Sequence, residues 1–573
     1  MKKFLAALFV AVFGVLGLTG CSTSGIQAGS VIRIAVLNDF NSVNADNVTA
    51  DGSLATNQQV AALLDPSFYF IDSDETLVAN QEFGTVKVIS KQPYQVRYTL
   101  TGNAKWSDGQ AVTADDLLLS WLAAKNPLDA GFNSNRAGSG LKWATSVPQL
   151  SADGKSLTIT FDHPVADYRT SLTLNAAAHL VAEQAFTLTD KAAALARFEL
   201  AVTSANLEDQ KLIAEQYAQI YLAKNLGALA PKTGAGPYLV SSYSEGQKLV
   251  LKANSAFSWG PLPKIETVEI KFFSDSTTML AAMQSGDVDV AAPKESGIAT
   301  VADISALAKS SGATLEIGGS HDIEALLLNF AEGSVFSATG NDPAKAVTLR
   351  TAFLKMVPIA KIMTALSADS PALEAKSWIY SSKSDYYQPF VQSNGSSNFA
   401  LQNAEQAQEL LKSKNIRTPI DVRVLYDQNN PRSKTEFALL NQYANTVGFN
   451  LLDVSSRNPR EVYTTGEFDV YITTQPMAGE VGGDPYWFTG SSVTKFADPA
   501  LDALLADLSG KSEAIDQVST LKKIDTELYA AQFGLPLYQV PSMLAYGKNV
   551  KAIVASPTGS SATYGYWNWS LSN

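Results

Sequence analysis

A chain of 573 residues is too long for a single hydrophobic core, and its length predicts about two to four domains. Hydrophobic residues make up 46% of the chain and charged residues 17%, a balance that excludes a disordered protein. The formal net charge of −12 repels polyanions at long range, so we expect no nucleic-acid partner.

The N-terminus has the pattern of an export signal. Two lysines precede the apolar run 4–18, which is too short for a permanent membrane span. The run ends in Leu18-Thr-Gly-Cys21, which resembles the lipobox of bacterial lipoproteins, and Cys21 is the only cysteine. We expect residues 1–20 to be removed and residues 21–30 to form a tether, with the exported protein held on the outer face of the cell membrane by a lipid on Cys21. The alternative is a plain signal peptide with an incidental thiol.

The clearest local pattern of the folded part lies within residues 96–127. Alternating apolar residues at 96–100 predict a half-buried strand, and Ser107-Asp-Gly109 provides a turn. Thr113 can cap a helix that begins at Ala114. We expect this helix to end before Asn126-Pro127, since proline disfavours helical geometry in the residue ahead of it.

Hydrophobic periodicity predicts alternating strands and helices in the rest of the chain. The continuous apolar run 325–330 is typical of a buried parallel strand. The other strands are expected at 31–37, 157–161, 238–243, 248–252, 266–273, 421–426 and 450–454. Helices are expected as a pair within 190–226, between Asp275 or Ser276 and Gly286, and at 348–357, 404–411, 432–447 and 513–532.

Several short motifs resemble those of the family 5 extracellular solute-binding proteins, the peptide and nickel class of receptors for ABC importers. They are Lys105-Trp-Ser-Asp-Gly109 followed by Thr113-Ala-Asp-Asp116, Thr233-Gly-Ala-Gly-Pro-Tyr238, Gly286-Asp-Val-Asp-Val290, Gly466-Glu-Phe-Asp-Val470 and Gly483-Asp-Pro-Tyr-Trp-Phe488. They occur in order across essentially the whole mature chain, and the segments between them resemble the family only weakly.

This resemblance implies a two-lobed α/β fold of the periplasmic-binding-protein type, type II, in the large peptide-receptor variant with an extra subdomain. Lobe I would comprise residues 31–272, with the subdomain inserted at about 74–165, lobe II residues 273–532, and residues 533–573 would return to lobe I. The strands that connect the lobes would cross near 272–273 and 537–540.

The resemblance also implies a receptor that closes on a solute, most plausibly an oligopeptide, and delivers it to ABC permease subunits. We expect a monomer without a cofactor. An oligosaccharide is the alternative cargo; a secreted glycan hydrolase and a non-transporting surface receptor or adhesin are the alternative functions. The candidate ligand-binding residues are Asn38, Asp39, Phe40, Phe132, Arg136, Glu480, Asp484, Trp487 and Phe488.

One departure from the family concerns the anchor for a peptide α-ammonium group. Receptors of this family commonly place an aspartate three residues before the Asp/Glu-Pro pair, and here that position is Val481. Valine carries no charge, so either Glu480 replaces the aspartate or, as we favour, the cargo has no free α-amine. Asp484, which precedes Pro485, is expected to cap a turn or a helix start.

Catalytic and metal-binding motifs are weak or missing. The three histidines lie far apart and no second cysteine exists, so we expect no metal site. Ser139-Gly-Leu-Lys142 and Lys232-Thr-Gly234 match two motifs of serine penicillin-recognising enzymes, but Ser139 is expected in a loop before a strand-like run rather than at a helix start. Asp115 and Asp116 could serve a glycosidase, although their place at a helix start already explains them. We therefore expect no catalytic residues.

Overall fold

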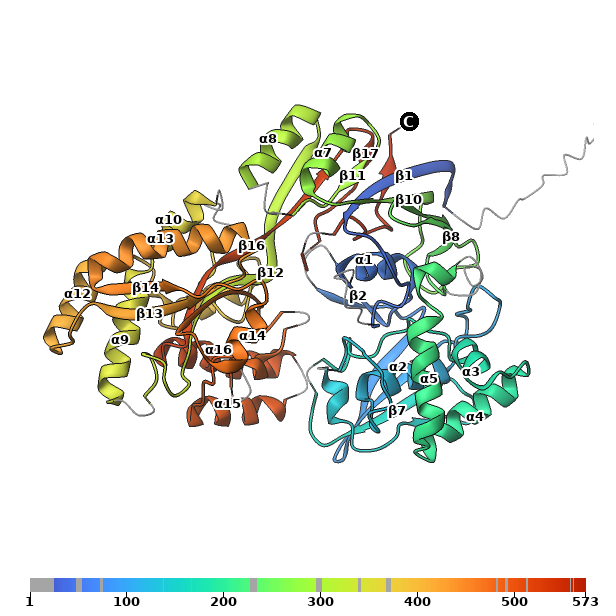
Figure 1. Ribbon diagram of the computed structural model, residues 1–573. Coiled ribbons are helices and arrows are strands. Elements are labelled where there is room, and N and C mark those ends of the chain that lie inside the picture. Colours follow the sequence, from blue (N-terminus) through green and yellow to red (C-terminus); the bar gives the residue numbers. More distant parts are fainter. Residues whose placement is uncertain are drawn as a thin grey trace, which may run out of the picture.

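Two lobes, each with its own hydrophobic core, make up the molecule (Figure 1). This computed structural model describes residues 25–47, 54–72, 76–137, 139–165, 167–226, 234–294, 301–338, 342–366, 373–480, 483–489, 493–511, 514–556, 558–559 and 561–572. Cys21 and Val481 therefore lie outside the described residues.

Lobe I contains the N-terminal half and the C-terminal end of the chain. Its elements are β1 (Gln27–Leu37), α1 (Leu54–Leu64), β2 (Tyr69–Ile71), β3 (Leu77–Ala79), β4 (Gly84–Lys91), β5 (Tyr94–Leu100), α2 (Ala114–Lys125), η1 (Gly140–Trp143), β6 (Gln149–Leu150), β7 (Ser156–Phe161), α3 (Ala178–Phe186), α4 (Lys191–Thr203), α5 (Leu207–Gln219), η2 (Ala223–Asn225), β8 (Tyr238–Ser244), β9 (Lys248–Ala253), β10 (Ile265–Phe273), α7 (Ser276–Gln284), β11 (Val290–Ala291), α8 (Val301–Ser311), β17 (Val550–Lys551) and β18 (Ser570–Leu571). Strands β4 to β7 form a separate four-stranded sheet in the order β4-β5-β7-β6.

Lobe II is built from the chain between residues 343 and 530. Its elements are α9 (Pro343–Met356), α10 (Ile359–Ala365), α11 (Tyr387–Val391), η5 (Ser396–Asn398), α12 (Ala404–Ser413), β13 (Ile420–Leu425), α13 (Pro431–Val447), β14 (Phe449–Asp453), α14 (Pro459–Thr465), β15 (Val470–Pro476), η6 (Pro485–Phe488), α15 (Pro499–Ser509) and α16 (Ala514–Ala530).

Two long antiparallel strands, β12 (Thr314–Leu328) and β16 (Gly534–Tyr546), connect the lobes (Figure 1). They lie at the centre of one ten-stranded sheet with the order β14-β13-β15-β12-β16-β11-β1-β10-β9-β8. The register of their pairing shifts twice, between Glu324 and Ala325 and, more strongly, between Gly319 and Ile323, where residues 320–322 lie opposite Val540. A bulge of this kind bends a strand, so the bend of the connecting ribbon lies between the two lobes.

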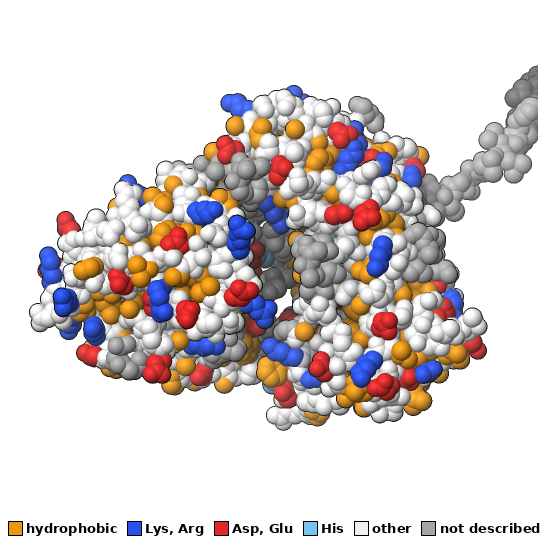
Figure 2. Space-filling view, in the orientation of Figure 1, with side chains coloured by type: hydrophobic (Ala, Val, Ile, Leu, Met, Phe, Trp, Pro, Cys, Tyr) orange, Lys and Arg blue, Asp and Glu red, His pale blue; other side chains and the backbone are white. Residues whose placement is uncertain are grey.

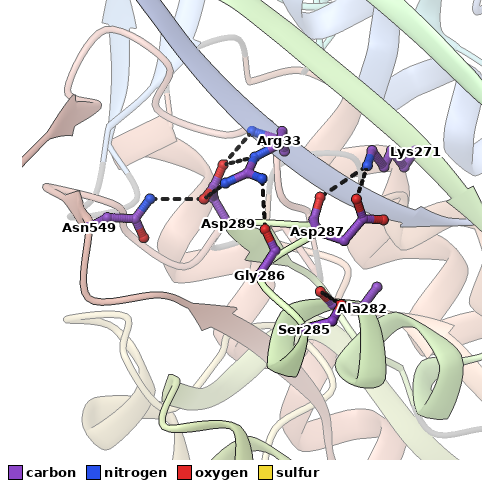
Figure 3. A network of polar contacts seen from close by, with 8 residues as sticks. All are labelled: Arg33, Lys271, Ala282, Ser285, Gly286, Asp287, Asp289 and Asn549. Carbon is purple, nitrogen blue, oxygen red and sulfur yellow. Dashed lines mark hydrogen bonds and ion pairs between the residues drawn. The ribbon is translucent and has the colours of Figure 1, made fainter.

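Each lobe holds two parallel strands together with the same arginine–aspartate clamp. In lobe I the backbone N–H and the Nε of Arg33 both donate to Asp289 Oδ2 at 2.9 Å, and Arg33 Nη2 lies 2.8 Å from Oδ1 (Figure 3). In lobe II the N–H and Nε of Arg423 donate to Asp469 Oδ2 at 2.8 and 2.9 Å. Both aspartates stand in a Gly-x-x-Asp-Val sequence just before the second strand, so the two motifs of the sequence perform one structural task.

The local predictions for the stretch around residue 114 are confirmed. Helix α2 begins at Ala114 and ends at Lys125, and Asp116 accepts hydrogen bonds from the backbone N–H of Thr113 at 2.8 Å and of Ala178 at 2.7 Å. The predicted hairpin is formed by β8 and β9, with Gly246 at φ 65° in its turn. Strand β13, helix α13 and strand β14 form the predicted βαβ unit, with the two strands parallel.

Two expectations need correction. The apolar run that begins at residue 325 is a buried strand, but it is antiparallel to both of its neighbours, β15 and β16. A continuous apolar run indicates that both faces of a strand are buried, and it does not indicate the direction of the neighbouring strands. Residues 276–294 and 301–311, expected in lobe II, lie on lobe I, because β11 pairs with β1 and α7 packs on both strands and on α8. The first crossing between the lobes is therefore β12, not residues 272–273.

Candidate functional site

A cavity of about 420 Å³ lies between the lobes beside the connecting strands, and Figure 2 shows the hollow that separates the lobes. Its walls come from both lobes and from the connecting strands: Ala55, Gln58, Gln59, Ala62, Ser556, Thr558, Gly559, Ser561 and Tyr564 of lobe I, Arg432 of lobe II, Ser320 and Asp322 of β12, Val540 and Pro541 of β16, and Lys294. We call it the hinge cavity. Its shape depends on the relative position of the two lobes, because neither lobe encloses it alone.

Charged side chains of both signs face the hinge cavity. Arg432 lies in the first turn of α13, whose cap Asn430 accepts a hydrogen bond from the Arg432 backbone N–H at 3.0 Å. Its Nη2 is 3.2 Å from Oε2 of Glu324, a fully buried residue of β12. Burial raises the pKa of Asp322, and the positive charges of His321, Lys294 and Arg432 oppose that rise. The hinge cavity thus offers polar anchors of both signs.

A second cavity of about 490 Å³ lies within lobe I; we call it the lobe I cavity. Its walls include the aromatic residues Phe68, Tyr69, Phe70, Phe257, Tyr564, Tyr566 and Trp567 and the charged residues Asp46, Asp65, Arg136 and Arg169. Four residues, Gln58, Ala62, Thr558 and Tyr564, line both cavities. The two cavities therefore share part of their walls, and we refer to them together as the connected cavities.

A third cavity, of about 820 Å³, lies between the tips of the lobes, at the end of the interface away from the connecting strands. Lys91, Gln92, Tyr94 and Pro164 of lobe I face Gly510, Lys511, Ile515, Asp516 and Ser519 of lobe II across it. None of the sequence-predicted ligand residues lines it, and we place the candidate site in the two connected cavities instead.

The loop that follows β1 is packed tightly into lobe I. Phe40 is 1% exposed, stacks on Phe272 at 6.5 Å and meets Tyr243 edge-on at 5.7 Å. Asp39 accepts a hydrogen bond from the Gly246 N–H at 3.0 Å, and Asn38 takes a positive φ of 65°. These contacts explain the loop as a connector between β1 and the β8–β9 hairpin, and none of the three residues lines either connected cavity.

The two ligand-binding residues predicted in segment 128–140 have different surroundings. Phe132 is buried and packs edge-on against Tyr217 at 5.5 Å. Arg136 lines the lobe I cavity, where its Nε lies 3.2 Å from Asp46 Oδ1. Of the candidate ligand-binding residues predicted from the sequence, Arg136 lies in the wall of a connected cavity.

Glu480 lies in lobe II close to the connecting strand β12. Its Oε1 accepts a hydrogen bond from the Ser381 N–H at 2.7 Å, and its Oε2 is 3.8 Å from His321 Nε2. The segment that carries Ser381 is itself fixed by Asp525, which accepts from the Trp378 N–H at 2.9 Å and from the Ser377 hydroxyl at 2.9 Å. Glu480 is therefore held by its own lobe before any ligand arrives.

The motif at 483–488 forms a short 3-10 helix in lobe II. Asp484 caps it, as predicted, by accepting a hydrogen bond from the Tyr486 N–H at 2.9 Å. Trp487 and Phe488 belong to an aromatic cluster with Phe533, at ring distances of 5.7 Å each, and Phe488 is fully buried. Burial raises the pKa of Asp167 in lobe I, and the charge of Asp484 adds to that rise, so this helix end faces lobe I across the cleft.

Asp116 and Ser139, two of the residues considered for catalysis, have structural roles. Asp116 accepts the two backbone hydrogen bonds given above, and Ser139 begins a short 3-10 helix, where the sequence suggested a loop, with its hydroxyl accepting from the Leu141 N–H at 3.4 Å. Lys232 lies outside the described residues. Within the described part of the chain, no group of three or more His, Cys, Asp or Glu side chains is placed to hold a metal ion, and no helix has the length and apolar composition to cross a bilayer.

Comparison with known proteins decides the family. Residues 84–498 match the family described as bacterial extracellular solute-binding proteins, family 5 (middle). The chain belongs to this family. Family 5 proteins bind peptides or other small solutes and work with ABC permeases.

Relatives of this family 5 protein cover nearly its full length at low identity. An uncharacterised lipoprotein of Mycobacterium leprae is 24% identical over 97% of this chain and 96% of its own length. The oligopeptide-binding protein OppA of Mycobacterium bovis is 24% identical over 92% of this chain and 88% of its own. The structure of the periplasmic EDTA-binding protein EppA is similar with a TM-score of 0.75 at 19% identity, covering 97% of this chain and all of that chain, which establishes the periplasmic-binding-protein-like fold.

Apart from Arg136, the residues that line the connected cavities were not predicted from the sequence. Lys294, Asp322 and Arg432 come from three separate segments, and Asp65, Tyr564 and Trp567 come from opposite ends of lobe I. Only Arg432 had a local marker, since it follows the helix-starting Asn430-Pro431 pair. The others meet only through the pairing of distant strands.

Proposed function

We propose that this family 5 protein captures a peptide or a similarly sized solute in the hinge and lobe I cavities and delivers it to ABC permease subunits. The observation that carries this proposal is the composition of the hinge cavity, whose walls come from both lobes and both connecting strands. A ligand seated there contacts both lobes at once, so it favours the conformation in which the lobes lie close together. The volumes of the two cavities are in the range of small-ligand sites.

Oligopeptides are the cargo that the OppA relative supports. The cavities hold side chains of both signs, and the lobe I cavity adds a group of aromatic residues to its wall, which suits a zwitterion with apolar side chains. The EDTA-binding neighbour supports a second candidate, a small polyanion, for which Lys294 and Arg432 would be the anchors.

We further propose that the protein is a monomer held on the outer face of the cell membrane by a lipid on Cys21. The lipobox-like sequence and the lipoprotein relative support this location. Such a tether would keep the receptor near its permease.

Native mass spectrometry of the mature protein, purified without denaturation, tests the cargo. We expect wild-type protein to release peptide masses. Ala62→Trp should abolish them, because Ala62 is an exposed position of α1 that lines both cavities and the indole would fill their junction. Ala193→Trp, at an exposed position of α4, is the matched control and should retain the cargo. Equal cargo on all three proteins would refute this site.

Closure is tested by small-angle scattering with the identified cargo. We expect a smaller radius of gyration at saturation, and no change for Ala62→Trp. An unchanged profile of the wild-type protein at saturating cargo would contradict a receptor that closes about β12 and β16.

A further inference from the structure

The lobe I cavity contains one carboxylate whose environment differs from that of the other acids near the site. Asp65 directly follows α1 and lines the cavity beside Tyr69 and Phe70 of β2. Its backbone position is fixed by the Gly-Pro-Tyr motif: a Cβ on Gly236 would lie 2.3 Å from the carbonyl carbon of Leu64 and 2.7 Å from the Asp65 nitrogen. Gly236 therefore packs directly on the backbone that carries Asp65.

The other acid of this cavity already has partners. Asp46 accepts a hydrogen bond from Arg136 Nε at 3.2 Å and from the Thr173 hydroxyl at 2.5 Å. The side chain of Asp65, in contrast, has no hydrogen bond or ion pair with any residue that the structure describes. Burial raises the pKa of Asp65 well above its usual range, and the charge of Asp46 adds to the rise. A positive charge placed beside Asp65 would relieve both effects.

Two acids of the hinge region are compensated by their surroundings. The positive charges of His321, Lys294 and Arg432 favour the charged form of Asp322. Glu480 accepts the Ser381 N–H and has His321 nearby. Asp65 is thus the carboxylate around the connected cavities with the strongest need of a cation.

The aromatic part of the same wall suits the apolar part of a ligand. Trp567 meets Phe70 edge-on at 5.2 Å and Tyr566 at 5.0 Å. The hydroxyl groups of Tyr564 and Tyr566 donate to the carbonyls of Ile71 and Pro261 at 3.0 and 2.8 Å, so the rings are fixed. Fixed aromatic rings provide both apolar contact and a favourable field for an ammonium group.

We propose that the lobe I cavity binds the cationic end of the cargo, an ammonium group attached to an apolar or aromatic body, with Asp65 as its counter-ion. This inference rests on the proposed function, because the lobe I cavity shares part of its wall with the hinge cavity, where the rest of the cargo would lie. The amine would then be bound in lobe I, and not in lobe II, where Val481 occupies the position of the family aspartate.

Phenethylamine and phenethyl alcohol are the probes for this site, since they have the same aromatic body and differ in charge. Ligand-observed NMR on the full mature protein should show binding of phenethylamine in preference to the alcohol. Asp65→Asn should weaken phenethylamine binding about ten- to hundredfold, the range expected for loss of a charge-assisted contact, and leave the alcohol unchanged. Glu208→Gln removes a carboxylate that is 82% exposed on α5 of the same lobe, and it should change neither probe.

A stability measurement separates a binding role from a structural one. Because the Asp65 side chain has no partner to lose among the described residues, Asp65→Asn should leave the melting temperature of the ligand-free protein unchanged or raise it. The affinity for phenethylamine should increase with pH up to neutrality, because a proton on Asp65 competes with the ammonium; Asp46, paired with Arg136, and Arg169 are the other charged groups of the cavity wall. Asp65→Asn should remove that pH dependence.

Three results would overturn the inference: no preference for the amine over the alcohol, unchanged amine binding by Asp65→Asn, or loss of amine binding by Glu480→Gln instead. This test fails separately from the test of the proposed function. If phenethylamine binding depends on Asp65 but native mass spectrometry finds no cargo that Ala62→Trp excludes, the proposed cargo site is wrong and the cation site stands.

Discussion

Replacing Arg33 by leucine should destabilise lobe I by about 2–3 kcal/mol. The change removes two side-chain hydrogen bonds to Asp289 and a third, from Nη1 to the Gly286 carbonyl at 2.7 Å (Figure 3). Breaking a buried ion pair costs about 3–5 kcal/mol. The Arg33 side chain is 35% exposed, and Asp289 keeps the Arg33 backbone N–H and the Asn549 amide as donors, so we take a value below that range.

The clamp of lobe II provides an internal comparison. Arg423→Leu removes the same contacts from Asp469, which keeps its own two backbone donors, from Arg423 and Val335. We therefore expect a similar loss of stability, confined to lobe II. Calorimetry of the mature protein would give the size of each loss, and hydrogen exchange would show which lobe opens.

A third substitution calibrates the measurement. Lys271 also belongs to β10 of lobe I, but its partner Asp287 is 56% exposed at 2.5 Å, and an exposed pair contributes at most about 1 kcal/mol. If Lys271→Leu cost as much as Arg33→Leu, or if Arg423→Leu increased exchange in lobe I, the buried clamp would not be the cause.

Three further predictions concern single positions. Burial raises the pKa of Asp525 from 3.8 to about 6. The protonated side chain therefore contributes fully to stability below pH 3.8, and this contribution is lost as the pH rises through about 6. In Asp525→Asn, the free energy of unfolding measured in urea should depend less on pH over that window. Gly236→Ala should lower the melting temperature, because its Cβ would overlap the Leu64 backbone, whereas Gly318→Ala, with 3.5 Å to its first neighbour and no positive φ, should raise stability by about 0.4–1 kcal/mol. Cys21→Ser should leave a precursor that no longer partitions into detergent; unchanged partitioning would place the anchor elsewhere.

Local sequence patterns predicted those parts of the fold whose causes are local. The helix start at Ala114 depends on Thr113 and Asp116, three residues apart, and the β8–β9 turn depends on Gly246. In each case the residues that decide the structure are neighbours in the chain. The structure therefore agrees with the sequence to within a residue or two at these sites.

Strand direction and the path between the lobes have causes that are not local. The apolar run of β12 looks the same whether its neighbours are parallel or antiparallel, because both arrangements bury both faces. Its neighbours β15 and β16 lie more than a hundred residues further along the chain. No pattern within the run itself could have given the direction. The same holds for the two-residue strand β11, whose pairing with β1 keeps α7 and α8 on lobe I.

The charged anchor of the site is subject to the same limit. In the sequence, a family motif marks the acids beside Val481 as candidates. Folding gives Glu480 and Asp484 partners within lobe II, the N–H groups of Ser381 and Tyr486. Asp65 carried no motif, yet α1 and the Gly236 segment hold it at a cavity wall, with no partner for its side chain among the residues that the structure describes. Whether a carboxylate has a partner depends on the space around it, and that space is built from residues 46, 136 and 564–567 as well as from the residues next to Asp65.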